Sequence, residues 1–108
     1  MLPKLNRLTK KNDFDAVFKK GISVKSGFLV CKILSTDLPA SRFGFVVSKK
    51  VSNKAIQRNK IKRMLKRTVL NNLKLIKKPV DVVIIALPGI LGKEFPEIQE
   101  TVDKIFKN

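Results

Sequence analysis

The 108-residue sequence contains no histidine, tryptophan or tyrosine, and Cys31 is its single cysteine. Histidine is the side chain that most often acts as a general acid or base near neutral pH, and it is one half of the usual zinc-binding patterns. One cysteine excludes an internal disulfide framework and favours a reducing, cytoplasmic compartment. We therefore expect no catalytic residues and no metal site in the protein itself.

Carboxylates are also scarce, because eight Asp and Glu stand against 24 Lys and Arg, for a formal net charge of +16. Residues 1–78 carry 21 basic and 3 acidic side chains, net +18, whereas residues 79–108 carry 3 and 5, net −2. Such a charge repels itself in the compact state, so we expect an anionic partner: nucleic acid, an anionic membrane or an acidic protein.

No apolar run approaches the roughly 20 residues of a membrane-spanning helix. The longest, VVIIALPGIL, is interrupted by Pro88 and Gly89, and the N-terminus lacks the apolar stretch of a signal peptide. With 44% hydrophobic residues, the chain has enough apolar side chains to fold around one core. These features predict a single domain over residues 1–108 that does not associate with a membrane.

Local signals in the first half predict a short helix followed by strands. The helix at 10–21 has Asn12 or Thr9 as a possible N-terminal cap, and Gly21 can end it. Residues 27–35 and 41–48 are rich in β-branched and aromatic side chains. Because a turn signal, TDLPA, separates these two strands, we expect them to pair with each other in antiparallel orientation.

The second half predicts a long helix at about 54–76, a strand at 79–88 and a closing helix at 95–108. The strand has few polar residues, which is typical of an interior strand covered on both faces. ISVKS, residues 22–26, adds a possible short strand to the first half. The order helix, two or three strands, helix, strand, helix indicates an α+β fold, a split α/β sandwich whose helices pack on a mixed sheet.

A helical wheel separates apolar from basic side chains in the long helix. Ile61, Met64 and Leu65 lie on one side, and basic residues fill the other. Lys62 with Lys66, and Arg63 with Arg67, repeat at i,i+4, a spacing that is repulsive unless an anion lies between them. We interpret this side as a polyanion-binding surface. A plain solvated face, a membrane-surface helix and a DNA-coating helix are the alternatives.

The phenylalanines have two interpretations. Phe14 and Phe18, one helical turn apart, form part of the core or line a groove in which an unpaired base stacks. In the second case Lys32 or Arg42 would hold the phosphates. Phe43 and Phe45 alternate with Gly44 along a strand, so they share one face and have the same two interpretations.

Residues 48–67, SKKVSNKAIQRNKIKRMLKR, resemble the signature of the bacterial ribonuclease P protein component. NRLTKKNDFDAVFKKG resembles that family's first helix, RFGFVVSKKV the strand before the signature helix, and VDVVIIA its last strand. The resemblance spans essentially the whole chain. It implies an accessory RNA-binding subunit of the cytoplasmic ribonucleoprotein that removes 5′ leaders from precursor tRNAs, in which a partner RNA holds the catalytic Mg²⁺.

The resemblance also implies site residues, no stable protein partner and a left-handed βαβ crossover around the signature helix. The helix that docks on the catalytic RNA would present Arg58, Asn59, Lys60, Lys62, Arg63, Lys66 and Arg67. The cleft for the single-stranded leader would involve Phe14, Phe18, Lys32, Arg42, Phe43 and Phe45. Additional basic contacts would come from Lys49, Lys50 and Lys54.

Two positions depart from the family pattern. Lys60 stands where the signature usually has a second Arg, so the charge is kept but a bidentate clamp is lost. Leu87 stands where an Arg commonly follows the last strand. The remaining alternative is a non-catalytic structural RNA-binding protein of ribosomal type, which would share the basic helix but lack the leader cleft.

Overall fold

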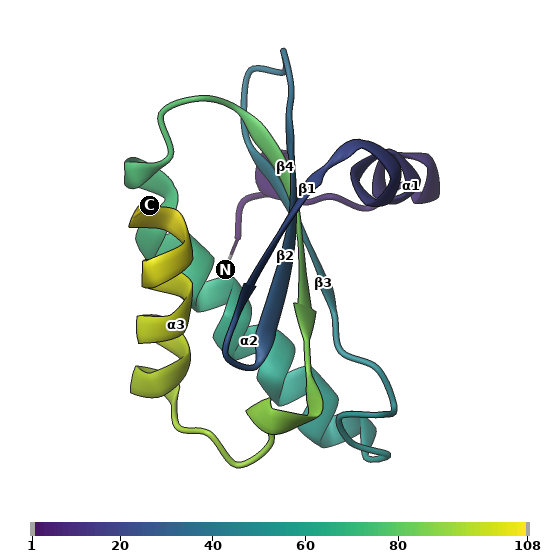
Figure 1. The fold of residues 1–108 in the computed structure, drawn as a ribbon, viewed down its shortest axis with the longest axis vertical. Coiled ribbons are helices and arrows are strands. Elements are labelled where there is room, and N and C mark those ends of the chain that lie inside the picture. The colour runs from purple at the N-terminus through teal and green to yellow at the C-terminus, as the bar shows by residue number, and fades with distance from the viewer. Residues whose placement is uncertain (1, 108) are drawn as a thin grey trace.

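Four strands form one mixed sheet, and three helices pack on it (Figure 1). The structure is a computed structural model that describes residues 2–107. The α+β class and the predicted order are confirmed, with ISVKS as a full strand. The elements are α1 (Lys11–Lys20), β1 (Ile22–Ser26), β2 (Leu29–Ser35), β3 (Arg42–Val46), α2 (Ala55–Asn72), β4 (Val80–Ala86) and α3 (Phe95–Lys107), with 3-10 turns at Lys4–Asn6, Leu73–Leu75 and Pro88–Ile90.

The spatial order of the strands is β1-β2-β4-β3, so the predicted antiparallel pairing of residues 27–35 with 41–48 is wrong. β4 lies between them: Ile84 is paired with Cys31 of β2 in antiparallel orientation and with Phe45 of β3 in parallel orientation. β4 is the most thoroughly buried strand, and a central position covers both its faces and both its hydrogen-bonding edges. The turn signal correctly located a reversal of the chain between β2 and β3. The two strands do not pair because β4, which is distant in sequence, lies between them.

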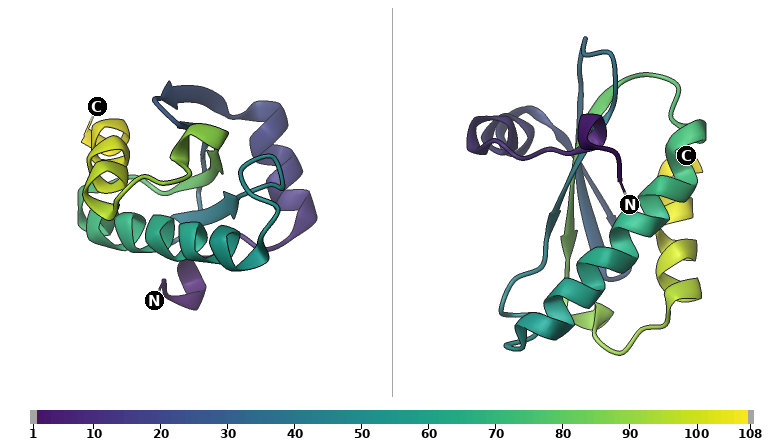
Figure 2. Two further views of the ribbon diagram at one scale, coloured as in Figure 1. Left: turned by 90° about the horizontal axis from the view of Figure 1, so that it is seen from below. Right: turned by 180° about the vertical axis from the view of Figure 1, so that it is seen from behind.

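The helices divide between the two faces of the sheet (Figures 1 and 2). α2 and α3 cover one face, where the main core contains Leu29, Cys31, Val82 and Ile84. α1 covers part of the other face, where a smaller cluster forms around Val17. Because side chains alternate along a strand, β2, β3 and β4 each contribute to both clusters.

α2 joins the parallel strands β3 and β4, and it crosses over the sheet in the left-handed sense that the resemblance implied (Figure 2). The crossover carries α2 along the outer side of the edge strand β3, with its apolar residues against the core. The fold therefore presents the other side of this helix to solvent.

Helix ends differ in detail from the sequence prediction. α1 begins after Lys10 and has no side-chain cap, so neither Asn12 nor Thr9 fills that role. Gly21 does end α1, but with a φ of −74°, and its N–H donates to the Val17 carbonyl. A side chain at Gly21 would clash with the backbone oxygens of Val17 and Ile33, so glycine allows α1 to approach β2 closely.

Candidate nucleic-acid interface

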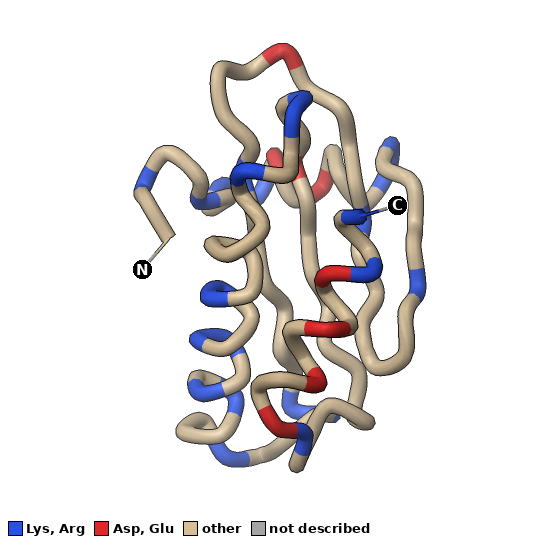
Figure 3. The backbone as a smooth tube through the Cα atoms, turned by 90° about the vertical axis from the view of Figure 1, so that its left-hand side faces the viewer, with Lys and Arg blue, Asp and Glu red and all other residues tan. Residues whose placement is uncertain are grey.

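α2 is amphipathic as predicted, with its basic side facing outward. Ile61, Leu65 and Val69 are buried against the core. The opposite side is exposed at Asn59, Lys60, Arg63, Lys66 and Arg67. Figure 3 shows Lys and Arg along the outer side of α2, with the acidic residues of α3 beside it. No Asp or Glu occurs in α2 to neutralise this row, so the helix offers a continuous surface for a polyanion.

Arg58 is less free than the residues that follow it. Its guanidinium donates a hydrogen bond of 3.0 Å to the Ser52 carbonyl, and the Ser52 hydroxyl donates to the Gln57 side chain. The Lys54 N–H in turn donates to the Ser52 hydroxyl at 3.1 Å. Arg58 thereby fixes the loop that precedes α2 while keeping further N–H donors for a ligand.

The same loop carries the three lysines for which additional RNA contacts were predicted from the sequence. Lys49 and Lys50 are exposed after β3, and Lys54 is the residue before the first turn of α2. The Lys50 N–H donates to the Ser48 hydroxyl at 3.3 Å. These three lysines extend the positive surface of α2 beyond its N-terminal end.

Arg67 and Lys62 flank the exposed basic side of α2 in opposite directions, Arg67 toward α3 and Lys62 toward β3. The Arg67 guanidinium carbon is 5.2 Å from the centre of the Phe95 ring, a cation–π arrangement that holds its charge in place. Lys62 is half-buried and, with Lys66, lines a groove of about 200 Å³ at the outer edge of β3. Phe14 and Phe45 line the same groove, so it brings together members of both predicted groups.

Arg42 is occupied by carboxylates from two elements. It donates to both oxygens of Asp81 in β4, at 2.9 and 2.6 Å, and to Asp13 of α1 at 3.1 Å. The hydrogen bond with Asp81 is the main cause that raises the pKa of Arg42. Because its charge is already paired, the geometry gives Arg42 the role of tying α1 to the sheet, rather than the phosphate-holding role expected from the sequence.

On the α1 side of the sheet, Phe14 and Phe18 lie at different depths. Phe14 is half-buried with its ring over Gly44, whereas Phe18 is 43% exposed. Lys32 pairs with Val83, whose side chain belongs to the cluster on this face. Phe14 and Lys32 therefore lie at the face that α1 partly covers, and Phe18 lies one helical turn along α1 from Phe14.

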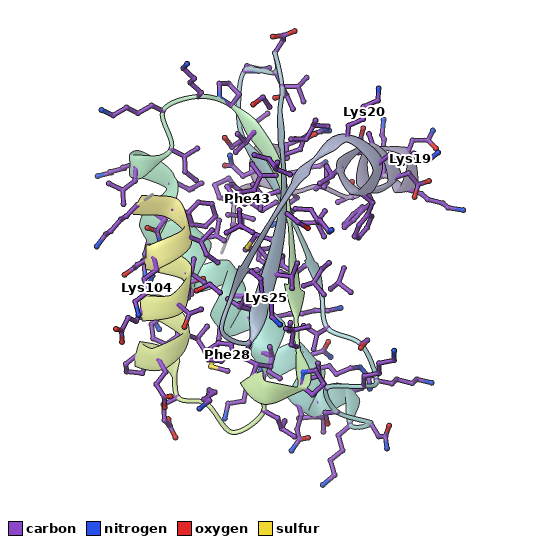
Figure 4. The ribbon with its side chains drawn as sticks, viewed as in Figure 1. Lys19, Lys20, Lys25, Phe28, Phe43 and Lys104 are labelled. Carbon is purple, nitrogen blue, oxygen red and sulfur yellow. The ribbon has the colours of Figure 1, made fainter. Side chains whose placement is uncertain are left out.

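Three further lysines lie on the elements that border this face and were not among the predicted site residues. Lys19 and Lys20 end α1, and Lys25 lies on β1 (Figure 4). Lys19 and Lys20 lie in the last turn of α1, where basic side chains favour the negative end of the helix dipole. Lys25 pairs with Val30, two residues from Lys32, so both lysines project from the same face. The assignment of residues 22–26 as a strand was the signal for Lys25, because side chains alternate between the two faces of a strand.

Phe43 and Phe45 share a face as predicted, but it is the opposite one. Phe43 is 1% exposed, and its ring packs edge-on against Phe106 of α3 with centroids 6.1 Å apart (Figure 4). Phe45 is half-buried against the same core. The core interpretation therefore holds for Phe43, whose ring is inaccessible to a leader on the α1 side. Phe45 reaches only the groove at the outer edge of β3.

Neither a metal-binding cluster nor a membrane-spanning helix is found among the described residues. Within residues 2–107, no three His, Cys, Asp or Glu side chains gather in an arrangement that could hold a metal ion. Among the helices described, none combines the length and apolar character needed to cross a membrane. Leu87, the second departure from the family pattern, follows β4 half-buried, with its N–H donating to the Phe28 carbonyl at 2.8 Å.

Comparison with known proteins gives one family. The family model described as Ribonuclease P matches residues 2–108. The ribonuclease P protein component of Alkaliphilus metalliredigens is 36% identical over 97 residues, covering 90% of this chain and 86% of that protein. The corresponding protein of Synechocystis is 37% identical over 107 residues, covering 97% and 86%.

Solved structures agree with these matches. The RNase P protein from Thermotoga maritima has a TM-score of 0.86 at 30% identity, covering 94% of this chain and 98% of that one. The RNase P protein of Staphylococcus aureus has a TM-score of 0.86 at 29% identity, covering 94% and 93%. The chain belongs to the bacterial ribonuclease P protein component family and is the RNA-binding protein subunit of ribonuclease P, a tRNA-processing endoribonuclease.

Proposed function

We propose that α2 docks on the catalytic RNA subunit of ribonuclease P and that the single-stranded 5′ leader of precursor tRNA lies between α1 and the sheet. In this assembly, which acts in the cytoplasm, the RNA performs catalysis with its own bound Mg²⁺, which supplies the metal chemistry of phosphodiester hydrolysis. The protein contributes binding and positioning. No stable protein partner is required.

The observation that carries this proposal is the uninterrupted basic side of α2. Asn59, Lys60, Arg63, Lys66 and Arg67 are exposed along one helix that contains no carboxylate. Each phosphate that a Lys or Arg contacts releases condensed counterions, which adds about 0.7 to 0.9 to the slope of log affinity against log salt. A docking surface of this kind therefore binds RNA tightly in low salt and much more weakly in high salt.

The leader-binding part rests on Phe14, Phe18, Lys32 and the neighbouring lysines of the α1 face. Phe18 is a partly exposed ring on which an unpaired base can stack, while Lys19, Lys20, Lys25 and Lys32 provide charge for its phosphates. Mature tRNA has no leader, so these contacts would strengthen binding of the precursor alone. The protein would thus help the ribonucleoprotein discriminate substrate from product.

The docking surface is tested by charge reversal. Arg63→Glu with Lys66→Glu changes two exposed residues, and we expect weaker binding to the catalytic RNA with a salt slope smaller by about 1 to 2. The matched control is Lys104→Glu with Lys107→Glu on α3, which makes the same change in net charge elsewhere. If both variants bind the RNA equally well, α2 is not the docking surface.

The functional role is tested by reconstitution. Adding the protein to the catalytic RNA in low Mg²⁺ should increase cleavage of a precursor tRNA, because the added cations reduce phosphate repulsion that Mg²⁺ otherwise screens. Unchanged cleavage would instead favour a purely structural RNA-binding role. Comparing the affinity of the assembled complex for tRNA with and without a leader then isolates the contribution of the α1 face.

A further inference from the structure

A groove of about 410 Å³ lies along a second flank of α2, where that helix faces the segment joining β4 to α3. It is separate from the groove at the outer edge of β3 and from the α1 face of the sheet. Ile61 and Met64 of α2 line it on one side, and Leu91 and Phe95 on the other. Gln57, Lys60, Lys93 and Glu94 supply its polar groups.

The chemistry of this groove suits a flat, partly polar ring. Its volume falls within the range of about 300–1,000 Å³ that is usual for small-ligand sites, and its walls combine apolar surface with few polar groups. Leu91 is 46% exposed, a large apolar side chain left open to solvent beside the groove. Proteins that bind unpaired RNA stack bases on aromatic side chains, and Phe95 supplies an aromatic ring in this lining.

The charges around the groove determine how such a ligand would be oriented. Lys60 lies on the α2 side, next to the exposed basic row, and would hold a phosphate there. On the far side, Lys93 is paired with Glu97 at 3.6 Å, and Glu94 would repel a phosphate. The Glu94 carboxylate can accept hydrogen bonds from an amino group on a base. Because Ser52 donates to the Gln57 carbonyl oxygen, the Gln57 amino group is left to donate to the base.

We propose that this groove receives one unpaired nucleobase of the RNA that docks on α2. The proposal rests on the RNA docking put forward above and extends it, because it adds a contact that depends on base stacking rather than on charge. Phosphates lie over Lys60 and the basic row, and the base enters between Met64 and the Leu91 segment. The groove thereby fixes the position of the RNA along the helix.

Leu91→Ser tests the proposal, with Leu75→Ser as the matched control. Leu75 is 50% exposed, so both changes remove a similarly accessible leucine, but Leu75 lies outside the groove. We expect Leu91→Ser to bind the catalytic RNA about tenfold more weakly at every salt concentration. The salt slope should stay unchanged, because an apolar contact releases no counterions. Leu75→Ser should bind like the original protein.

Chemical probing of base edges in the RNA gives the second measurement. The original protein and Leu75→Ser should protect one unpaired nucleotide that Leu91→Ser leaves reactive. Original affinity for Leu91→Ser, a changed salt slope, or the absence of a Leu91-dependent protected base would each overturn the proposal. A protected base is also what separates RNA from a protein side chain as the occupant.

Two controls keep the result interpretable. Thermal unfolding of Leu91→Ser is measured first, and if its midpoint is lowered, Leu91→Ala replaces it in both assays. Arg63→Glu with Lys66→Glu is run in parallel. If that double variant keeps full affinity, the docking proposal itself fails, whereas a failure confined to Leu91→Ser removes only the base-binding groove.

Discussion

Arg42 and Asp81 form a two-pronged ion pair between neighbouring strands, with both Asp81 oxygens accepting from the same guanidinium at 2.9 and 2.6 Å. The Asp81 side chain is 6% exposed and that of Arg42 is 23% exposed. Asp13 of α1 joins the pair at 3.1 Å. One arginine therefore links β3, β4 and the helix that covers them, and the placement of the α1 face depends on it.

Asp81→Asn should destabilise the protein by about 3 kcal/mol, because it removes one charge of a largely buried pair and leaves the arginine partly uncompensated. Urea unfolding measures this loss. Hydrogen exchange should also become faster in α1, since Arg42 is its ion-paired link to the sheet beside the apolar cluster around Val17. Glu100→Gln is the control, because its pair with Lys104 is at least 67% exposed on both sides and contributes little. Equal stability of the two variants would contradict the structural role of Arg42.

Phe43→Ala should reduce mainly the stability of the protein, whereas Phe18→Ala should reduce mainly the binding of precursor tRNA. Phe43 is 1% exposed, so its truncation should cost about 3–5 kcal/mol and lower the thermal midpoint strongly. Phe18 is 43% exposed, and its truncation should change stability by only about 0.5 kcal/mol. Phe18→Ala should instead reduce the preference of the assembled complex for precursor tRNA. If Phe18→Ala lost stability without losing that preference, Phe18 would be a packing residue alone.

Local patterns were sufficient for the elements themselves. The wheel of residues 54–76 correctly separated Ile61 and Leu65 from Arg63 and Lys66, because a helix fixes which side chains share a side. The Pro-bounded apolar stretch correctly gave the interior strand β4. The end of α2 was placed late: the helix stops at Asn72 and continues as a 3-10 turn at Leu73–Leu75.

Non-local relationships were beyond the sequence. The alternation of side chains along a strand predicts that Phe43 and Phe45 share a face of the sheet. Which face it is depends on the register with β4, some 40 residues away along the chain. The partners of Arg42 are likewise 29 and 39 residues distant, so a lone basic residue on a strand resembled a free phosphate ligand. The groove beside Leu91 arises only when the segment after β4 returns to α2.

Asp103 should make stability depend on pH in acid. A hydrogen bond from Asn72 lowers the pKa of Asp103, and a second bond from Gln99 and the charge of Lys107 act in the same direction. The ionised carboxylate therefore stabilises the fold above its unfolded pKa of about 3.9, and this contribution disappears as pH falls through the lower folded value. Asp103→Asn should be less stable than the original at pH 7, with the difference shrinking below about pH 4. Urea unfolding across this pH range measures it; a constant difference would contradict the mechanism.

Gly44 and Phe14 should be energetically coupled, because the Phe14 ring occupies the space that a side chain at Gly44 would fill. Gly44→Ala is expected to destabilise the protein by about 1–3 kcal/mol by forcing the ring and α1 away from β3. Phe14→Leu shortens the side chain, so the clash should be relieved in the double variant. The double variant should therefore lose less free energy of unfolding than the sum of the two single losses.

Gly89→Ala is the control for that cycle, since a side chain there would make only an ordinary contact of 3.5 Å with Phe28. Combined with Phe14→Leu, it should give additive changes in the free energy of unfolding. Additivity in the Gly44 pair as well would mean that α1 is not held against β3 by this contact. In that case the position of Phe14, and with it the width of the face on which the leader is proposed to lie, would be set by Arg42 and by the buried cluster around Val17.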